Sequence, residues 1–248
     1  MGFIITPDPL NRTLQHLCIR AWDEDCFREL NASCDRYHRI DIWCNIPQGA
    51  WAGLSCVKPL KVRISGRDIN DISGLADYGP GFSDMHIRPV GEGVLEFPFS
   101  RLSRLDSLFI AAVEKRQTIA GLAGSPVKKL SLRSIRKASD SFALQGMHEL
   151  KQITVRNLGH LRSFKMADAE KLEYVEITNA PKLMEFTIPE SITLKSLWLQ
   201  TVPVELAKKL AKHSPRTVYV SKGRQFPDQS MVEAIFPGAE LNWMRGPG

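Results

Sequence analysis

Basic and aromatic side chains recur beside short apolar triplets along this sequence, and they are its best candidates for binding. Arginine and lysine bind carboxylates and phosphates, and tryptophan, tyrosine and arginine dominate the energetics of protein interfaces. Repeated at equivalent positions of a regular element, they would form a binding surface. The candidate partner-binding residues are Trp43, Arg63, Arg88, Phe109, Arg133, Arg156, Tyr174, Trp198 and Tyr219.

The element that must position these residues is a repeat. An apolar-x-x-apolar-x-apolar template recurs with starts 20 to 25 residues apart, and each match ends in the two-residue alternation typical of a short strand with one buried face. Since a single strand per coil cannot bury its apolar edge alone, stacked coils must share one core. The matches begin at Tyr37, Val57, Phe82, Leu105, Val127, Leu150, Leu172 and Leu194, and Pro215 leads a weaker ninth match.

The spacing predicts an α/β solenoid, with about nine coils of 20–25 residues and a parallel concave β-sheet over residues 37–248. Apolar residues halfway between the later strands, at 161–166 and 183–188, predict extended return segments. Helical spacing predicts helices over 204–213 and 228–236.

Residues 1–36 are predicted to be an N-terminal helical cap, continuous with the array, that covers its first coil. Within residues 8–34, Leu10, Leu14, Leu17, Cys18 and Ala21 share one helical face after Asp8 and Pro9. The alternative is an early degenerate repeat, since Leu14, Leu17 and Ile19 also fit the strand template.

The motif LEYVEITNAPKL at 172–183 resembles the L-x-x-L-x-I-x-N-x-P-x-L form of leucine-rich repeat proteins, and DINDISGLADY at 68–78 resembles the loops of bacterial members related to internalins. The resemblance covers about residues 37–243 and implies the solenoid fold. The chain differs from the family at one position of the repeat, three residues after the last apolar residue of the strand, where the family normally has Asn or Cys. This chain has Ile135, Leu158, Ala180 and Val202 at that position. We therefore expect the asparagine ladder of the family to be missing.

Charge is concentrated on the predicted outward positions of the strands. Twelve basic and five acidic residues fall there, whereas the whole chain carries +6. Arg63, Arg88, Arg133 and Arg156 share the last outward position of their coils, so we expect them to form one row, interrupted by Ala111. Strands about 4.8 Å apart bring such charges within one Debye length, which favours an acidic partner.

Other chemistries find little support in the sequence. The five cysteines, at 18, 26, 34, 44 and 56, form no C-x-x-C pair, so we expect free, buried thiols in place of disulfides or a zinc site. No phosphate-binding, hydrolase or metalloprotease motif occurs, so we expect no enzyme activity, no cofactor and no metal. No apolar run approaches bilayer length, and the N-terminus lacks the pattern of an export signal, so we expect a cytoplasmic protein without a membrane partner.

These observations predict a non-enzymatic module that binds one protein with an acidic surface. By analogy, a short repeat protein of this kind resembles an immunity protein of a polymorphic or contact-dependent toxin system, whose partner is a toxin domain. Nucleic-acid binding, above all of RNA, is the alternative, but Glu173 and Glu176 would repel phosphate. A leucine-rich-repeat scaffold or effector is the third hypothesis.

Overall fold

The computed structural model describes residues 2–7, 15–33, 37–47, 61–65, 82–88, 95–96, 99–111, 119–134 and 140–244. The chain divides into two compact units, Met1–Val127 and Lys128–Gly248. This division lies inside the predicted array and not at residue 36. The family-like segment at 68–78 and the template residues Val57 and Leu60 lie outside the described residues.

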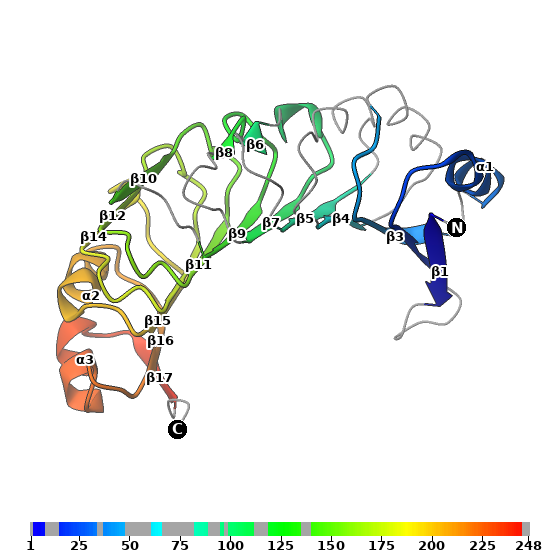
Figure 1. The fold of residues 1–248 in the computed structure, drawn as a ribbon. Helices are drawn as coiled ribbons and strands as arrows, with labels where there is room; N and C mark the ends of the chain where they lie inside the picture. The colour runs from blue at the N-terminus through cyan, green and yellow to red at the C-terminus, as the bar shows by residue number, and fades with distance from the viewer. Residues whose placement is uncertain are drawn as a thin grey trace. The chain divides into compact units, whose positions relative to one another are not determined.

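The first unit contains a mostly parallel sheet, in which the strands lie in the order β1, β2, β3, β4, β5 and β7 (Figure 1). β1 and β2 pair antiparallel, and the later pairs of this unit are parallel. The elements are β1 (Phe3–Pro7), β2 (Gln15–Ile19), α1 (Glu24–Ser33), β3 (Tyr37–Ile42), β4 (Lys61–Ile64), β5 (Asp84–Ile87), the short return strands β6 (Leu95–Glu96) and β8 (Ile119–Ala120), the 3-10 turn η4 (Phe99–Arg101) and β7 (Ser107–Ala111).

The second unit has the same plan, with its parallel strands in the order β9, β11, β13, β15, β16 and β17. A second layer, β10-β12-β14, pairs in parallel on the return side of the coils (Figure 1). The elements are β9 (Lys129–Arg133), β10 (Ser141–Leu144), β11 (Gln152–Arg156), β12 (Ser163–Met166), β13 (Tyr174–Thr178), β14 (Glu185–Thr187), β15 (Ser196–Gln200), α2 (Val204–Ala211), β16 (Thr217–Ser221), α3 (Gln229–Ile235) and β17 (Glu240–Met244). Each unit is therefore mostly β with few helices, as a solenoid-like α/β repeat requires.

The core of the second unit follows the predicted alternation. Ile153, Val175 and Leu197 are the second residues of β11, β13 and β15, pair in register, and are each at most 2% exposed. On the return side, the rings of Phe142, Phe164 and Phe186 stack with centroids 5.3 and 5.0 Å apart. The predicted extended return segments are confirmed, and aromatic stacking joins them from coil to coil.

Four coils of the second unit, those of β9, β11, β13 and β15, turn after the strand at a residue with positive φ: Ser134, Asn157, Asn179 and Thr201. The N–H groups of Asn157 and Asn179 donate to the carbonyls of Thr178 and Gln200 in the next strand, at 3.0 and 2.9 Å. Backbone groups thus satisfy much of the turn, and Leu158, Ala180 and Val202 can be fully buried. The Asn179 side chain donates to Asn157 Oδ1 at 2.9 Å, one position before the place of the family's ladder, and this contact joins two side chains and satisfies no backbone group.

The helical interpretation of residues 8–34 is wrong for residues 15–19, which form β2 and pair with β3. Leu17 and Ile19 are fully buried, as the alternative strand template predicts. Among the described residues of this segment, the helix is α1, before which Asp23 accepts a hydrogen bond from the Cys26 N–H at 2.8 Å. Leu10 and Leu14 lie outside the described residues.

The two predicted C-terminal helices are confirmed. α2 buries Leu206, Ala207 and Leu210, which share one face at helical spacing. At the start of α3, the Asp228 carboxylate accepts a hydrogen bond from the Met231 N–H at 2.9 Å and so satisfies one of the free donors of the first turn.

His213, which follows α2, makes the stability of the second unit depend on pH. Its side chain is buried, its Nδ1 lies 3.3 Å from the Ile192 carbonyl, and burial lowers its pKa below the ordinary value. The folded chain therefore binds fewer protons than the unfolded chain as the pH falls below about 6.5. Stability should be complete above that pH and be lost as the pH falls through the lower pKa of the folded state.

Urea unfolding of wild type and His213→Gln at pH 7.5 and 5.5 measures this contribution. The free energy of unfolding of the wild type should fall more between the two pH values than that of the variant. Equal falls in both proteins would show that His213 is not the group responsible.

Candidate functional site

The nine predicted partner-binding residues all lie in the described part of the chain, and the unit boundary separates them into two groups. The first unit holds Trp43, Arg63, Arg88 and Phe109, and the second holds Arg133, Arg156, Tyr174, Trp198 and Tyr219.

In the first unit, the predicted row containing both Arg63 and Arg88 is wrong. Arg63 pairs with His86 in the neighbouring strand, and Arg88 follows two residues later. The strand of this coil uses Val62 and Ile64 as its buried pair, so its template starts at Pro59 and not at Val57. A shift by two residues keeps every side chain on the same face of a strand, so alternation alone cannot detect it. A proline at the first position of the template, as in the match that Pro215 leads, is the sequence feature that could have indicated the start at Pro59.

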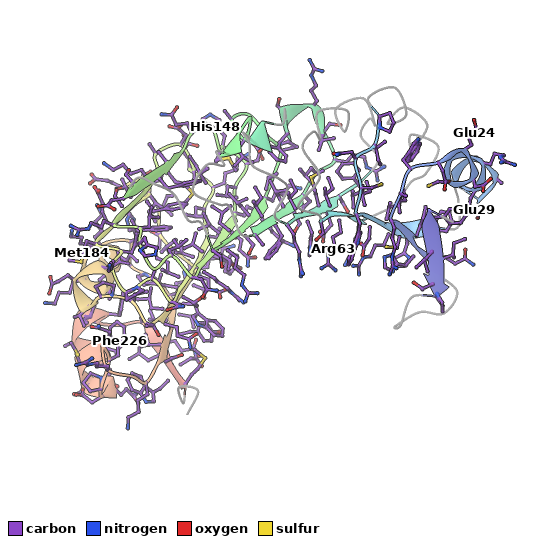
Figure 2. All side chains as sticks on the ribbon, in the orientation of Figure 1. Glu24, Glu29, Arg63, His148, Met184 and Phe226 are labelled. Atoms are coloured by element: carbon purple, nitrogen blue, oxygen red, sulfur yellow. The ribbon has the colours of Figure 1, made fainter. Side chains whose placement is uncertain are left out.

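Arg63 lies among charged residues without an anion of its own. Figure 2 shows its side chain on the side of the sheet opposite β6 and β8. Burial, followed by the charge of Arg88, lowers the pKa of its guanidinium, and its buried Nε has no hydrogen-bond partner among the described residues. The neighbouring Asp41 is already engaged by Arg39, through Nε–Oδ1 and Nη2–Oδ2 contacts of 2.9 Å each.

Asp41 also anchors an array that the sequence did not reveal. His16 Nε2 lies 3.1 Å from Asp41 Oδ2, and His16 Nδ1 lies 3.3 Å from the Thr6 hydroxyl. β1, β2 and β3 each contribute one of these side chains. Only 5% of the Asp41 side chain is exposed, although the alternation places it outward. Because Arg39 neutralises the carboxylate, we interpret the array as a polar clamp across these strands.

The aromatic candidates of the first unit differ in their surroundings. Trp43, directly after β3, is 47% exposed. Phe109 is half-buried, and its ring centroid lies 5.1 Å from that of His86 in the next strand. Trp43 therefore keeps free surface for a partner, whereas a neighbouring ring covers part of Phe109.

In the second unit, the expected pairing of Arg133 with Arg156 is confirmed, and both side chains are exposed. They differ in their own contacts. Arg156 donates from Nε to Glu176 Oε1 at 2.8 Å, and Glu176 also accepts from the Thr154 hydroxyl at 3.2 Å. For Arg133, no ion pair occurs with any residue that the structure describes. The guanidinium of Arg133 is thus free for an external anion.

Arg133 and Arg156 belong to a larger cationic face, which we define by the exposed lysines and arginines at the outward positions of β9, β11, β13, β15, β16 and β17 and directly before these strands. Its members are Lys128, Lys129, Arg133, Lys151, Arg156, Lys195 and Arg216. Three glutamates share these positions: Glu173, Glu176 and Glu240. Lys195 Nζ lies 2.8 Å from Glu173 Oε1, so two of the glutamates are paired inside the face, and positive charge remains in excess.

An aromatic pair lies beside the cationic face. Trp198 and Tyr219 occupy the same row of β15 and β16, with ring centroids 5.3 Å apart and planes inclined by 19°. Both are half-buried, and the buried indole Nε1 of Trp198 has no hydrogen-bond partner among the described residues. Tyr174, two strands away from Tyr219 in the sheet order, is 40% exposed. Flat apolar surface and cations therefore alternate across this sheet.

The cysteines show no reactive site in the part of the chain that the structure describes. Cys18, Cys26 and Cys44 are free, and burial raises the pKa of each thiol, that of Cys26 to about 12. Cys26 is buried as expected, while Cys18 and Cys44 are half-buried. Cys34 and Cys56 lie outside the described residues. High thiol pKa values disfavour the nucleophilic thiolate.

No group of three or more His, Cys, Asp and Glu side chains within the described ranges could hold a metal ion. None of the helices described combines the length and apolar character that crossing a lipid bilayer requires. No protein-family model matches the chain, and a search of curated proteins gives no match. The candidate site therefore depends on its own geometry and charge.

Proposed function

We propose that the chain is a non-enzymatic binding module that holds the acidic surface of one partner protein against the cationic face of its second unit. The observation that carries the proposal is the excess of exposed cations on a sheet face that also carries the Trp198–Tyr219 stack. Desolvated aromatic side chains supply affinity, and surrounding cations supply charge complementarity and faster association.

A leucine-rich-repeat-like solenoid of about nine coils is the architecture that we infer for this role, since parallel strands repeat one outward position many times. Free thiols at Cys18, Cys26 and Cys44 support a reducing, cytoplasmic setting. The narrower form of the proposal is that the partner is a toxin domain, which the chain would neutralise by covering its active site.

Nucleic acid is the competing ligand, and the row through the middle of the face argues against it. The residues that follow one another in this row are Ser131, Thr154, Glu176, Trp198 and Tyr219. Repeat proteins that read RNA place equivalent side chains in every coil, whereas this row changes its chemistry from strand to strand. Glu173 and Glu240 add further negative charge.

The double variant Arg133→Glu/Arg156→Glu tests the proposal. Partners captured by the wild-type chain from its native cells are identified by mass spectrometry, purified and titrated by calorimetry. We expect the variant to bind about 100-fold more weakly, because two cations of the face become anions. A toxin domain captured in this way should lose its activity with the wild-type chain and keep it with the variant.

Lys208→Glu/Lys212→Glu is the matched control, since these exposed lysines lie on α2 and just after it, and the change in charge is the same. Its affinity should equal that of the wild type. Equal affinities of the folded Arg133/Arg156 variant and the wild type would refute the assignment of the site. Specific binding of a single-stranded RNA 20-mer, with a steep loss of affinity on added salt, would favour the competing function.

A further inference from the structure

A small cavity lies at the end of the cationic face, between the ends of β15 and β16. Its volume is about 280 Å³, and its walls include Gln200, Thr201, Ser221, Lys222, Arg224 and Phe226. Phe226, labelled in Figure 2, is only 1% exposed, so this wall is held in the core.

The cavity exists because the backbone ladder of the second unit is interrupted there. β13 and β15 pair as far as Thr178 and Gln200, and the Asn179 N–H still donates to the Gln200 carbonyl beyond the strand. β15 and β16 pair only as far as Leu199 and Val220. The strand ends therefore separate one residue earlier in this coil than in the preceding coil.

The interruption leaves a backbone donor unused. Within residues 140–244, all of which are described, the N–H of Thr201 has no hydrogen-bond acceptor, although the equivalent N–H groups of Asn157 and Asn179 each have one. Ser221 instead continues its pairing on the other side, with Met244 of β17. Thr201 is exposed, so this donor is open to a ligand that accepts hydrogen bonds.

The side chains of the walls favour the same class of ligand. Lys222 and Arg224 are exposed, and neither forms an ion pair with any residue in the described ranges. The Ser221 hydroxyl and the Gln200 amide add donors, and no carboxylate lines the cavity. The volume falls just below the range typical of drug-sized ligands, so it suits a single side chain.

Gln200 lies two residues after Trp198, and Ser221 lies two residues after Tyr219. Because side chains two residues apart in a strand point to the same face, both lie on the face that carries the stacked aromatic pair. A peptide lying across the stack can therefore place one of its side chains in the cavity. We propose that this cavity is the anchor for an aspartate or glutamate side chain of the acidic partner, with the carboxylate bound by Lys222, Arg224 and the Thr201 N–H. This inference rests on the proposed function and names the chemical group that the site takes.

Amide chemical shifts of the full ¹⁵N-labelled chain test the anchor, with N-acetylglutamate N-methylamide as the probe. Titration at constant ionic strength should give saturable shifts at Thr201 and residues 221–225. N-acetylglutamine N-methylamide, which has the same shape without the charge, should give none. In Lys222→Gln/Arg224→Gln, the affinity for the glutamate probe should fall about tenfold or more, because both charge-assisted contacts are lost.

Lys208→Gln/Lys212→Gln provides the matched change in charge away from the cavity and should bind the probe as the wild type does. Shifts of equal size with both probes, or an unchanged affinity in the folded Lys222/Arg224 variant, would overturn the proposal. Tighter binding of inorganic phosphate than of the glutamate probe would reassign the cavity to a free anion and also overturn it.

The anchor can fail while the proposed function stands. In that case, the partner would bind the Lys222→Gln/Arg224→Gln variant as tightly as it binds the wild type, but would not bind the Arg133→Glu/Arg156→Glu variant. This result would refute the anchor and leave the cationic face as the binding site.

Discussion

Val175→Asp should unfold the second unit. Val175 is the second residue of β13, is 2% exposed, and is flanked in register by Ile153 and Leu197. A carboxyl group at this position has no partner, and burying it costs several kcal/mol even when a raised pKa neutralises it, which is comparable with the about 5–15 kcal/mol by which a domain is typically stable. Circular dichroism should show the loss of β-structure, and hydrogen exchange should lose protection across β11, β13 and β15.

Tyr174→Asp is the matched control, because it places the same side chain one residue earlier on the opposite face, where Tyr174 is 40% exposed. It should melt within a few degrees of the wild type, since surface substitutions change stability by about 0.5 kcal/mol or less. If Val175→Asp melted like the parent protein, the assignment of inward and outward positions in the second unit would be wrong.

Asp41→Asn should have the second largest effect, in the first unit. The substitution keeps the shape of the side chain but removes the charge that pairs with Arg39 and His16, whose side chains are 31% and 20% exposed. Losing hydrogen bonds to a charged group typically costs about 1.5–3 kcal/mol, and the partial exposure of Arg39 lets water compensate part of its charge. Urea unfolding should show a loss of about this size, with hydrogen exchange faster in β2, β3 and β4.

The control is Asp25→Asn, which breaks an exposed pair with Arg28 on α1. Exposed pairs contribute about 0–1 kcal/mol, so its unfolding free energy should stay close to that of the wild type. A loss no larger for Asp41→Asn than for Asp25→Asn would show that the polar clamp does not stabilise these strands.

The repeat, the buried face of each strand in the second unit, the extended returns and both C-terminal helices could all be predicted from the amino-acid sequence. These features depend on spacing within one coil, such as the alternation of Ile153 and Val155, which are both fully buried. Local spacing also predicted the pairing of Arg133 with Arg156, since both coils follow the template without ambiguity.

Two local patterns allowed two interpretations each, and contacts between strands select one of them. Residues 15–19 carry apolar side chains that suit both a helical face and a strand, and pairing with β3 selects the strand. Around Arg63, templates starting at Val57 and at Pro59 both place apolar residues inward, and the packing of Val62 beside Met85 selects the second.

The charge that is available for binding was also decided by contacts between coils. Glu176 neutralises Arg156, Glu173 pairs with Lys195, and Asp41 is buried although it lies at an outward position. The cavity beside Thr201 exists because one ladder ends early. Periodicity specifies which face a side chain occupies, whereas register, ion pairing and the end of a ladder depend on residues about one coil apart in sequence, and only the folded chain brings these together.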